Sequence, residues 1–329
     1  MKKTAGICAG ILAAGIAGVS LYQYGSFSLR KRGKYENPLL PKGVPASKTD
    51  REKMLEGLAS KNPEKISVTS DDGLKLTGYL FRTKPQNDLV IISFHGYHSS
   101  GLAGMGWFAP VYEECGADYL IVNERAHEDS KGNLITFGVK EKNDGILWVR
   151  EIILRYGTGV KIFLHGVSMG AATVMMMASD RRLSPNVIGF AEDCGYDDMG
   201  DEYRYLMRKY PKILREFGFV MMNLTGLVFT GCSLYDAAPV KSVSKAVIPG
   251  LFIHGTEDGM VPYEMGQNLY NAYNGYKEFF AVKGAGHARC RNEDPEGYRT
   301  VFTEFVQKCL ETAVKNDPLK TRSAIIPGE

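Results

Sequence analysis

The chain has 329 residues, of which 44% are hydrophobic. This length suits one large α/β domain with an insertion or two small domains, and the composition argues against intrinsic disorder. The formal net charge of +3 arises at the N-terminus, because the first 34 residues contain several basic side chains and no acid. The rest of the chain is mildly acidic, at about −3, and gives no electrostatic reason to expect a nucleic acid partner.

Residues 4–22 form an uncharged stretch with basic residues on both sides. Its length fits a single membrane span. Because no small-x-small cleavage site follows it, residues 1–34 are predicted to be an uncleaved single-pass anchor in the cell membrane, with a cleaved secretory signal as the alternative. Positive charge on both sides leaves the orientation open.

The segment 35–62 combines prolines with charges and is predicted to be a linker that leads into a short helix. The folded domain is expected at 63–316, followed by an unstructured tail at 317–329. Two β-rich runs, 65–70 and 74–82, are separated by Asp-Asp-Gly. That composition predicts an antiparallel hairpin at the edge of a sheet.

Beyond the hairpin, apolar strand-like runs alternate with longer helical segments. The runs lie at residues 89–94, 119–123, 160–165, 187–192, 250–255 and 277–282. Continuous apolar runs separated by helices predict a mostly parallel central sheet flanked by helices, which is the α/β class. One of these helices is expected at 140–156, where apolar residues recur on one face.

A segment rich in Tyr, Phe and Met interrupts this alternation at about 196–246. We interpret it as an inserted helical cap over a pocket. Its most apolar part, FGFVMMNLTGLVF, is too short to span a bilayer. Four aromatic residues of the cap are candidates for lining the pocket, namely Tyr203, Tyr205, Phe217 and Phe219.

The motif Gly-Val-Ser-Met-Gly at 166–170 follows a predicted strand and precedes an apolar helix. Glycines on both sides permit a sharp turn that projects the hydroxyl of Ser168 from the sheet edge. The pattern alone has modest specificity, and the strand-turn-helix context makes Ser168 the candidate nucleophile.

A serine hydroxyl needs a base, and the base needs a group that fixes its tautomer. Asp258 and His287 each follow a predicted strand, and the carboxyl ends of parallel strands meet at one edge of a sheet. We therefore predict His287 as general base and Asp258 as the orienting acid. Asp193, after another strand, is the rival acid, and Glu257 is a weaker one.

An oxyanion hole is expected from two backbone N–H groups, those of Met169 and Tyr97. Three other histidines, His95, His165 and His254, each precede a glycine at a strand end and are predicted to shape turns. The six cysteines and the remaining histidines lack metal-ligand or disulfide spacing, so no metal is expected. No organic cofactor is expected, since no Gly-x-Gly-x-x-Gly follows a strand.

These motifs resemble those of the α/β-hydrolase superfamily over about residues 65–312, and in detail those of bacterial serine-aminopeptidase-like or lysophospholipase-like hydrolases. The run NERAHEDSKGNLITFGVKEKND is similar to the family's Asp-x-Arg-x-His-Gly-x-Ser segment, although Asn123 replaces the usual Asp and Glu128 the usual Gly. The resemblance implies the α/β-hydrolase fold with a cap. The chain order Ser, Asp, His also agrees with that fold.

The predicted function is hydrolysis of an ester of moderate length and apolar character through an acyl-enzyme on Ser168. A serine peptidase of the aminopeptidase-like type is the alternative, although no acidic anchor for a substrate amine can be placed. A catalytically inactive, membrane-tethered binding protein is the alternative of another class. The physiological substrate and the oligomeric state stay open.

Overall fold

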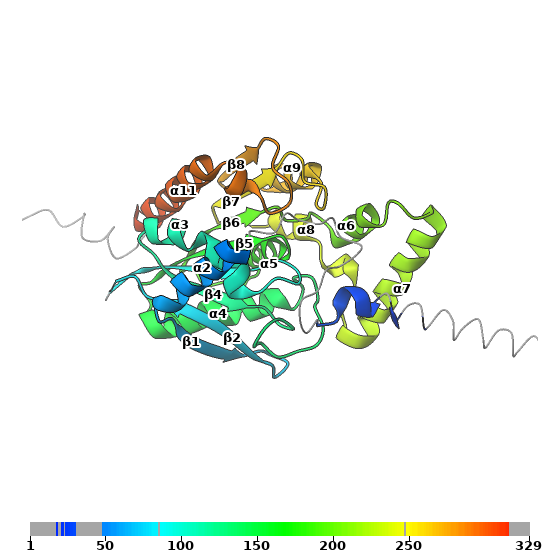
Figure 1. The fold of residues 1–329 in the computed structure, drawn as a ribbon, viewed down its shortest axis with the longest axis horizontal. Helices are drawn as coiled ribbons and strands as arrows, with labels where there is room; N and C mark the ends of the chain where they lie inside the picture. Colours follow the sequence, from blue (N-terminus) through cyan, green and yellow to red (C-terminus); the bar gives the residue numbers. More distant parts are fainter. Residues whose placement is uncertain are drawn as a thin grey trace, which may run out of the picture.

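The computed structural model describes residues 18, 21–22, 24–30, 48–84, 86–246 and 248–315 (Figure 1). The tail from residue 317 onward lies outside the described residues, as do residues 31–47 of the predicted linker. Most of the predicted membrane anchor also lies outside them, and the structure gives that prediction no support. The linker does contain a helix, α2 (Lys48–Ser60), as expected.

An eight-stranded sheet forms the centre of the molecule, in the order β1-β2-β4-β3-β5-β6-β7-β8. Strand β1 is antiparallel to β2, which is antiparallel to β4, and the other strands are parallel. The prediction of a mostly parallel sheet with an edge hairpin is therefore confirmed. The strands are β1 (Glu64–Thr69), β2 (Lys75–Phe81), β3 (Leu89–Phe94), β4 (Asp118–Asn123), β5 (Lys161–Val167), β6 (Val187–Asp193), β7 (Gly250–Gly255) and β8 (Lys277–Val282).

Helices cover both faces of this sheet. One face packs against α2, α3 (Ala109–Glu114) and α11 (Pro295–Lys315), and the other against α4 (Glu141–Tyr156), α5 (Met169–Ala178), α8 (Pro239–Val243) and α9 (Tyr263–Ala272). Since both faces are covered, strands β3 and β4 are buried at every position, which explains why their sequences are largely apolar.

The segment between β6 and β7 is helical, as expected for a cap. It contains α6 (Met199–Leu206), α7 (Lys212–Thr230), a 3-10 turn η3 (Leu234–Asp236) and α8. Within the described part of the chain, α7 is the one helix long and apolar enough to cross a membrane, and 33% of that stretch is buried in the protein. In Figure 1, α6 and α7 extend from the side of the sheet domain.

Two segments that precede residue 63 pack onto the folded body. Leu58 of α2 is 4% exposed and joins the core, so the helix in the predicted linker belongs to the domain. Residues 24–28 are helical and contact the cap, where the rings of Tyr24 and Phe229 stack at 6.1 Å. The boundary expected at 63 therefore lies too late, because the sequence did not reveal these packing contacts.

Candidate active site

Ser168 occupies the sharp turn between β5 and α5, with φ of 57° and ψ of −115°. This left-handed backbone is costly for a residue with a side chain and is typical of a nucleophile elbow. A Cβ on Gly166 would lie 2.1 Å from the carbonyl oxygen of Gly170, and one on Gly170 would lie 2.1 Å from that of Phe94. Both glycines are therefore required for the turn to pack against its neighbours.

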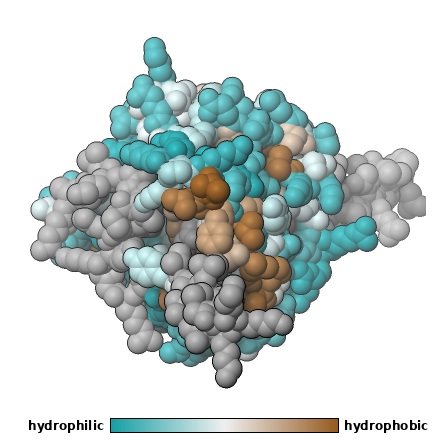
Figure 2. Space-filling view, turned by 90° about the vertical axis from the view of Figure 1, so that its right-hand side faces the viewer, coloured by the Kyte–Doolittle hydropathy of each residue, from teal (hydrophilic) through white to brown (hydrophobic). Residues whose placement is uncertain are grey.

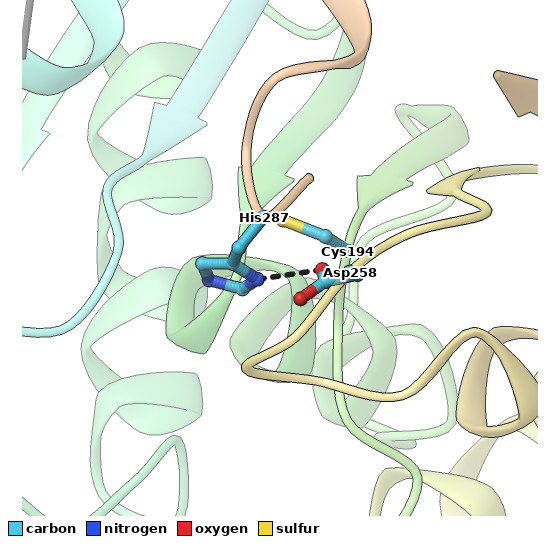
Figure 3. Close-up of side chains that lie close together, drawn as sticks. All are labelled: Cys194, Asp258 and His287. Carbon is cyan, nitrogen blue, oxygen red and sulfur yellow. Dashed lines mark hydrogen bonds and ion pairs between the residues drawn. The ribbon is translucent and has the colours of Figure 1, made fainter. Parts of the chain in front are cut away.

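The turn brings Ser168 to two side chains that follow the last strands of the sheet. His287, beyond β8, places Nε2 2.9 Å from Oγ of Ser168. Its Nδ1 lies 2.7 Å from Oδ2 of Asp258, which follows β7 (Figure 3). The three predicted residues thus form one hydrogen-bonded chain from hydroxyl to carboxylate. Ser168 is half-buried and the His287 side chain is 16% exposed, so an outside molecule can reach both.

The carboxylate of Asp258 is fully buried and well provided with hydrogen bonds. Its Oδ1 accepts from the backbone N–H groups of Met260 and Val261, each at 2.9 Å. Burial would raise the pKa of Asp258, but His287, His254 and the N–H of Met260 outweigh it and hold the pKa below its usual range. An ionised carboxylate here can fix the tautomer of His287 and stabilise its cation.

The rival acids occupy different surroundings. Asp193 ends β6 and is fully buried, and burial raises its pKa to about 7. Its Oδ1 has no hydrogen-bond partner within the described residues. Glu257 is exposed to solvent. Because Nδ1 of His287 bonds to Asp258, the geometry favours Asp258 as the orienting acid over either rival.

Cys194 also lies beside this pair (Figure 3). Its sulfur and one ligand atom each of Asp258 and His287 lie within 4.8 Å of one another, as metal ligands could. Burial, however, raises the pKa of Cys194 well above its usual value, so the thiolate that a metal requires is disfavoured. Asp258 and His287 bond to each other instead, which is the arrangement of a catalytic pair.

The loop after β3 passes close to Ser168, where the second oxyanion donor is expected. A Cβ on Gly96 would lie 3.3 Å from Cβ of Ser168, so the backbone beside Tyr97 approaches the serine. The N–H of Met169 lies in the first turn of α5, where helical N–H groups have no partner within the helix. The predicted pair of donors therefore flanks Ser168.

Histidines hold this loop in place without reaching the reacting atoms. Burial lowers the pKa of His95 to about 3, and the Nε2 of its neutral ring accepts from the N–H of Glu124 at 3.1 Å. Nε2 of His127 accepts from the N–H of His98 at 3.2 Å. His165, in contrast, lies in the core, where its ring nitrogens bond to the hydroxyls of Tyr112 and Tyr298. The turn-shaping role expected for His95 agrees with these contacts.

The four aromatic residues predicted to line the pocket differ in their surroundings. Tyr203 and Phe219 are buried and belong to an apolar cluster that also contains Met169, next to the nucleophile. Tyr205 instead lies against Arg208, whose guanidinium is 3.8 Å from the ring centre. Phe217 is 39% exposed on α7. Only Tyr203 and Phe219 thus belong to the cluster that reaches the site.

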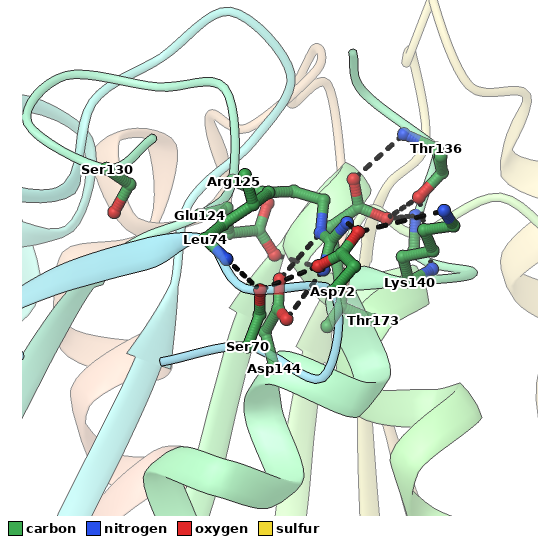
Figure 4. Close-up of polar contacts among 12 residues, drawn as sticks. Ser70, Asp72, Leu74, Glu124, Arg125, Ser130, Thr136, Lys140, Asp144 and Thr173 are labelled. Carbon is green, nitrogen blue, oxygen red and sulfur yellow. Dashed lines mark hydrogen bonds and ion pairs between the residues drawn. The ribbon is translucent and has the colours of Figure 1, made fainter. Parts of the chain in front are cut away.

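A network of charged side chains supports the loop that follows β4 (Figure 4). Arg125 donates from Nε and Nη2 to the two carboxylate oxygens of Asp144, each at 2.7 Å, and from Nη1 to Asp72 at 2.9 Å. Glu141 accepts from the N–H of Thr136 at 2.8 Å. Arg125 and Asp144 can be buried because they are paired, and Glu141 because neutral donors satisfy it.

The two departures from the family pattern lie in this same loop. Asn123 accepts from the N–H of Gly101 at 3.1 Å and donates to Thr77 at 3.2 Å, so its amide joins three segments. Glu128 has φ of 43°, a left-handed conformation that a glycine would adopt without strain. The backbone keeps a shape suited to Gly although the residue has changed.

His254 was expected to shape a turn, but sequence reasoning missed two contacts near the site, that of His254 with Asp258 and that of Tyr97 with Phe27. His254 Nε2 lies 3.6 Å from Oδ2 of Asp258 and 3.0 Å from the carbonyl oxygen of Val261, and it helps to fix this turn. The hydroxyl of Tyr97 donates to the carbonyl of Phe27 at 2.5 Å. His254 could have been found from its place four residues before Asp258, but no local pattern indicates the contact with Phe27.

Comparisons with known proteins agree with this architecture. No protein-family model matches the chain. The Bacillus subtilis (strain 168) protein YqkD is 24% identical over 243 residues, covering 73% of this chain and 77% of YqkD. The Pyrococcus furiosus esterase Pf2001 is similar in structure, with a TM-score of 0.60 and 22% identity over 82% of this chain and 98% of the esterase. The α/β hydrolase GrgF from Penicillium sp. sh18 has a TM-score of 0.57 and 17% identity, covering 75% of this chain and 98% of GrgF.

These likenesses and the order of the strands define the class of structure: the chain has the α/β-hydrolase fold. The fold predicted from the sequence motifs is thereby confirmed. Ser168, His287 and Asp258 all lie beyond the carboxyl ends of strands, at the edge where open α/β sheets bind their ligands.

Proposed function

We propose that this protein is a serine hydrolase that cleaves carboxylic esters through an acyl-enzyme on Ser168. The observation that carries the proposal is the unbroken chain of hydrogen bonds from Ser168 Oγ to His287 at 2.9 Å and from His287 to Asp258 at 2.7 Å. Such a chain activates a hydroxyl that is otherwise a weak nucleophile.

In the proposed reaction, Oγ of Ser168 attacks the ester carbonyl carbon while Nε2 of His287 takes its proton. The N–H groups of Met169 and Tyr97 stabilise the negative oxygen of the tetrahedral intermediate. The imidazolium then donates the proton to the leaving alcohol, and an acyl-enzyme is left. A water molecule, deprotonated by His287, attacks this ester, and collapse of the second intermediate releases the acid and returns the proton to Ser168.

Apolar surroundings favour an ester over an aminopeptide substrate. Met169 belongs to an apolar cluster that includes Met, Phe and Tyr side chains from the cap and the N-terminal residues. Glu202 is a buried acid of the cap, and burial, followed by the nearby charge of Asp258, raises its pKa well above the usual range. A neutral carboxyl group would be a poor partner for the ammonium group of a peptide N-terminus.

We further propose that residues 4–22 hold the protein at the cell membrane as an uncleaved anchor. The uncharged sequence and its basic flanks support this location. If so, the full chain resists extraction from membranes by alkaline carbonate. Release under those conditions would favour the cleaved secretory form.

Labelling of the full chain with a fluorophosphonate probe tests the proposed chemistry. We expect labelling of the wild type, none of Ser168→Ala, and strongly reduced labelling of His287→Ala. Ser179→Ala, which removes a hydroxyl at the other end of α5, is the matched control and should label normally. No labelling of the wild type, with no turnover of a panel of esters, would favour a binding protein instead.

A further inference from the structure

The outer face of α7 exposes a stripe of large apolar side chains, seen as the brown region of Figure 2. We define the α7 stripe as Ile213 (79% exposed), Val220 (50%), Leu224 (52%), Leu227 (50%) and Val228 (78%). Most of these residues are separated by three or four positions, so they lie on one side of the helix. Contiguous apolar surfaces of this kind mark contact with a partner or a membrane.

The opposite face of α7 fixes the helix to the body. Phe219 and Met222 are each 2% exposed and pack into the apolar cluster of the cap. A helix held in this way cannot cross a bilayer without leaving the protein. It can lie in the plane of the interface with its outer face among the acyl chains, and no charged residue occurs between 217 and 230 to oppose that.

The uncharged N-terminal segment leads to this same surface. Leu21 and Tyr22 are exposed by 51% and 79%, and Tyr24 stacks at 6.1 Å on Phe229, which follows Val228 in the last turn of α7. In Figure 1 the helical residues near position 25 lie beside α7. The described N-terminal residues therefore lie beside the C-terminal end of the α7 stripe. The sequence before them has no charge from residue 4 onward.

Positive charges border the apolar surface. Arg208, Lys209 and Lys212 are exposed at the N-terminal end of α7. Basic side chains beside an apolar face favour a bilayer that contains anionic lipid.

We infer that the α7 stripe docks in the interface of an anionic phospholipid bilayer and that the substrate is an acyl ester held in that bilayer. The inference about the substrate rests on the proposed function. One apolar cluster joins Phe219 and Met222 of α7 to Met169 beside the nucleophile, so an acyl chain leaving the bilayer meets apolar side chains along this direction. The cap thus faces the lipid on one side and the site on the other.

Two tryptophan variants of the full chain test the contact. Val228→Trp lies in the α7 stripe, and Leu154→Trp lies on α4, where Leu154 is 81% exposed, on the sheet domain. The vesicles contain phosphatidylcholine and phosphatidylglycerol with bromine near the carbonyl end of the acyl chain. We expect bromine to quench the fluorescence of the introduced tryptophan about twofold in Val228→Trp and not at all in Leu154→Trp. Equal emission of both variants overturns the inference.

A second copy of the chain is the alternative occupant of the α7 stripe. In that case, bromine would leave the emission of Val228→Trp unchanged, and sedimentation of the full chain in mild detergent would show a dimer that Val228→Glu dissociates. That outcome also overturns the inference.

Two charge variants test the route of the substrate. For Leu224→Glu and Val228→Glu we expect unchanged turnover of a water-soluble short-chain ester, but about tenfold slower hydrolysis of an ester embedded in the same vesicles. Leu154→Glu is the matched control and should match the wild type on both. Equal rates of all variants on the embedded ester overturn the inferred substrate class. If the wild type hydrolyses neither ester, the proposed function fails, while bromine quenching still decides the docking.

Discussion

Asp258 and His287 are joined by a 2.7 Å hydrogen bond between Oδ2 and Nδ1, although a second buried acid, Asp193, ends the neighbouring strand β6. The two acids differ in what surrounds them. Asp258 receives two backbone N–H bonds at 2.9 Å, whereas one oxygen of Asp193 has no partner within the described residues. Of the two, only Asp258 is therefore in surroundings that stabilise a negative charge.

Asp258→Asn should lower kcat for a soluble ester by about 10³- to 10⁴-fold, because an amide cannot hold His287 in the required tautomer or stabilise its cation. Asp193→Asn, with almost the same volume, should lower kcat by less than about tenfold. Steady-state kinetics of both variants, after circular dichroism confirms folding, checks this. A larger loss in Asp193→Asn than in Asp258→Asn would assign the orienting role to Asp193.

Asp193 should also make stability depend on pH. Burial raises its pKa to about 7 in the folded protein. Between about pH 4, where the unfolded acid ionises, and about pH 7, the folded state holds a proton that the unfolded state has lost, so stability falls as the pH rises. Asp193→Asn does not titrate at this position, so it escapes this loss of stability. Its free energy of unfolding should therefore improve relative to wild type by up to about 4 kcal/mol from pH 4 to pH 7.

Urea unfolding at pH 4.5 and pH 7.5 measures that difference. The control is Asp71→Asn, which changes an exposed acid in the turn between β1 and β2. Its difference from wild type should be the same at both pH values. A flat difference for Asp193→Asn as well would mean that Asp193 is already ionised in the folded protein at low pH.

The sheet and the meeting of the three candidate site residues were predictable because their signals are local. Buried parallel strands require unbroken apolar runs, and the turn at Ser168 requires glycines at fixed positions. Asp258 and His287 could be placed because each directly follows such a run, and the ends of parallel strands meet at one edge.

The packing of the cap and the N-terminal contacts could not be predicted, since they depend on long-range packing. Phe217 and Phe219 are two positions apart on α7, yet one is exposed and the other is buried against the body. Composition does not reveal which side of an apolar helix faces the protein. The stacking of Tyr24 on Phe229, more than half the chain away, leaves no pattern in either local sequence.

Arg125→Met should lower the free energy of unfolding by about 3–5 kcal/mol, because it leaves the buried carboxylate of Asp144 without its partner. Both side chains are 5% exposed and are joined by two hydrogen bonds of 2.7 Å. The double variant Arg125→Met/Asp144→Leu removes both charges and should recover part of that loss. Denaturant unfolding compares them, and a double variant less stable than Arg125→Met would show that burial of an unpaired Asp144 is not the cause.

Glu128→Gly should raise the free energy of unfolding by about 0.5–1 kcal/mol, since φ of 43° is strained for Glu and ordinary for Gly. The Glu128 side chain is exposed, and Arg30 bonds to its backbone carbonyl, which glycine retains. Lys131→Gly is the matched control: Lys131 is exposed in the same loop without a positive φ, so glycine there should lower stability by about 0.5–1 kcal/mol. Thermal unfolding distinguishes the two, because a similar loss in both variants would mean that the left-handed backbone of Glu128 carries no strain that glycine can relieve.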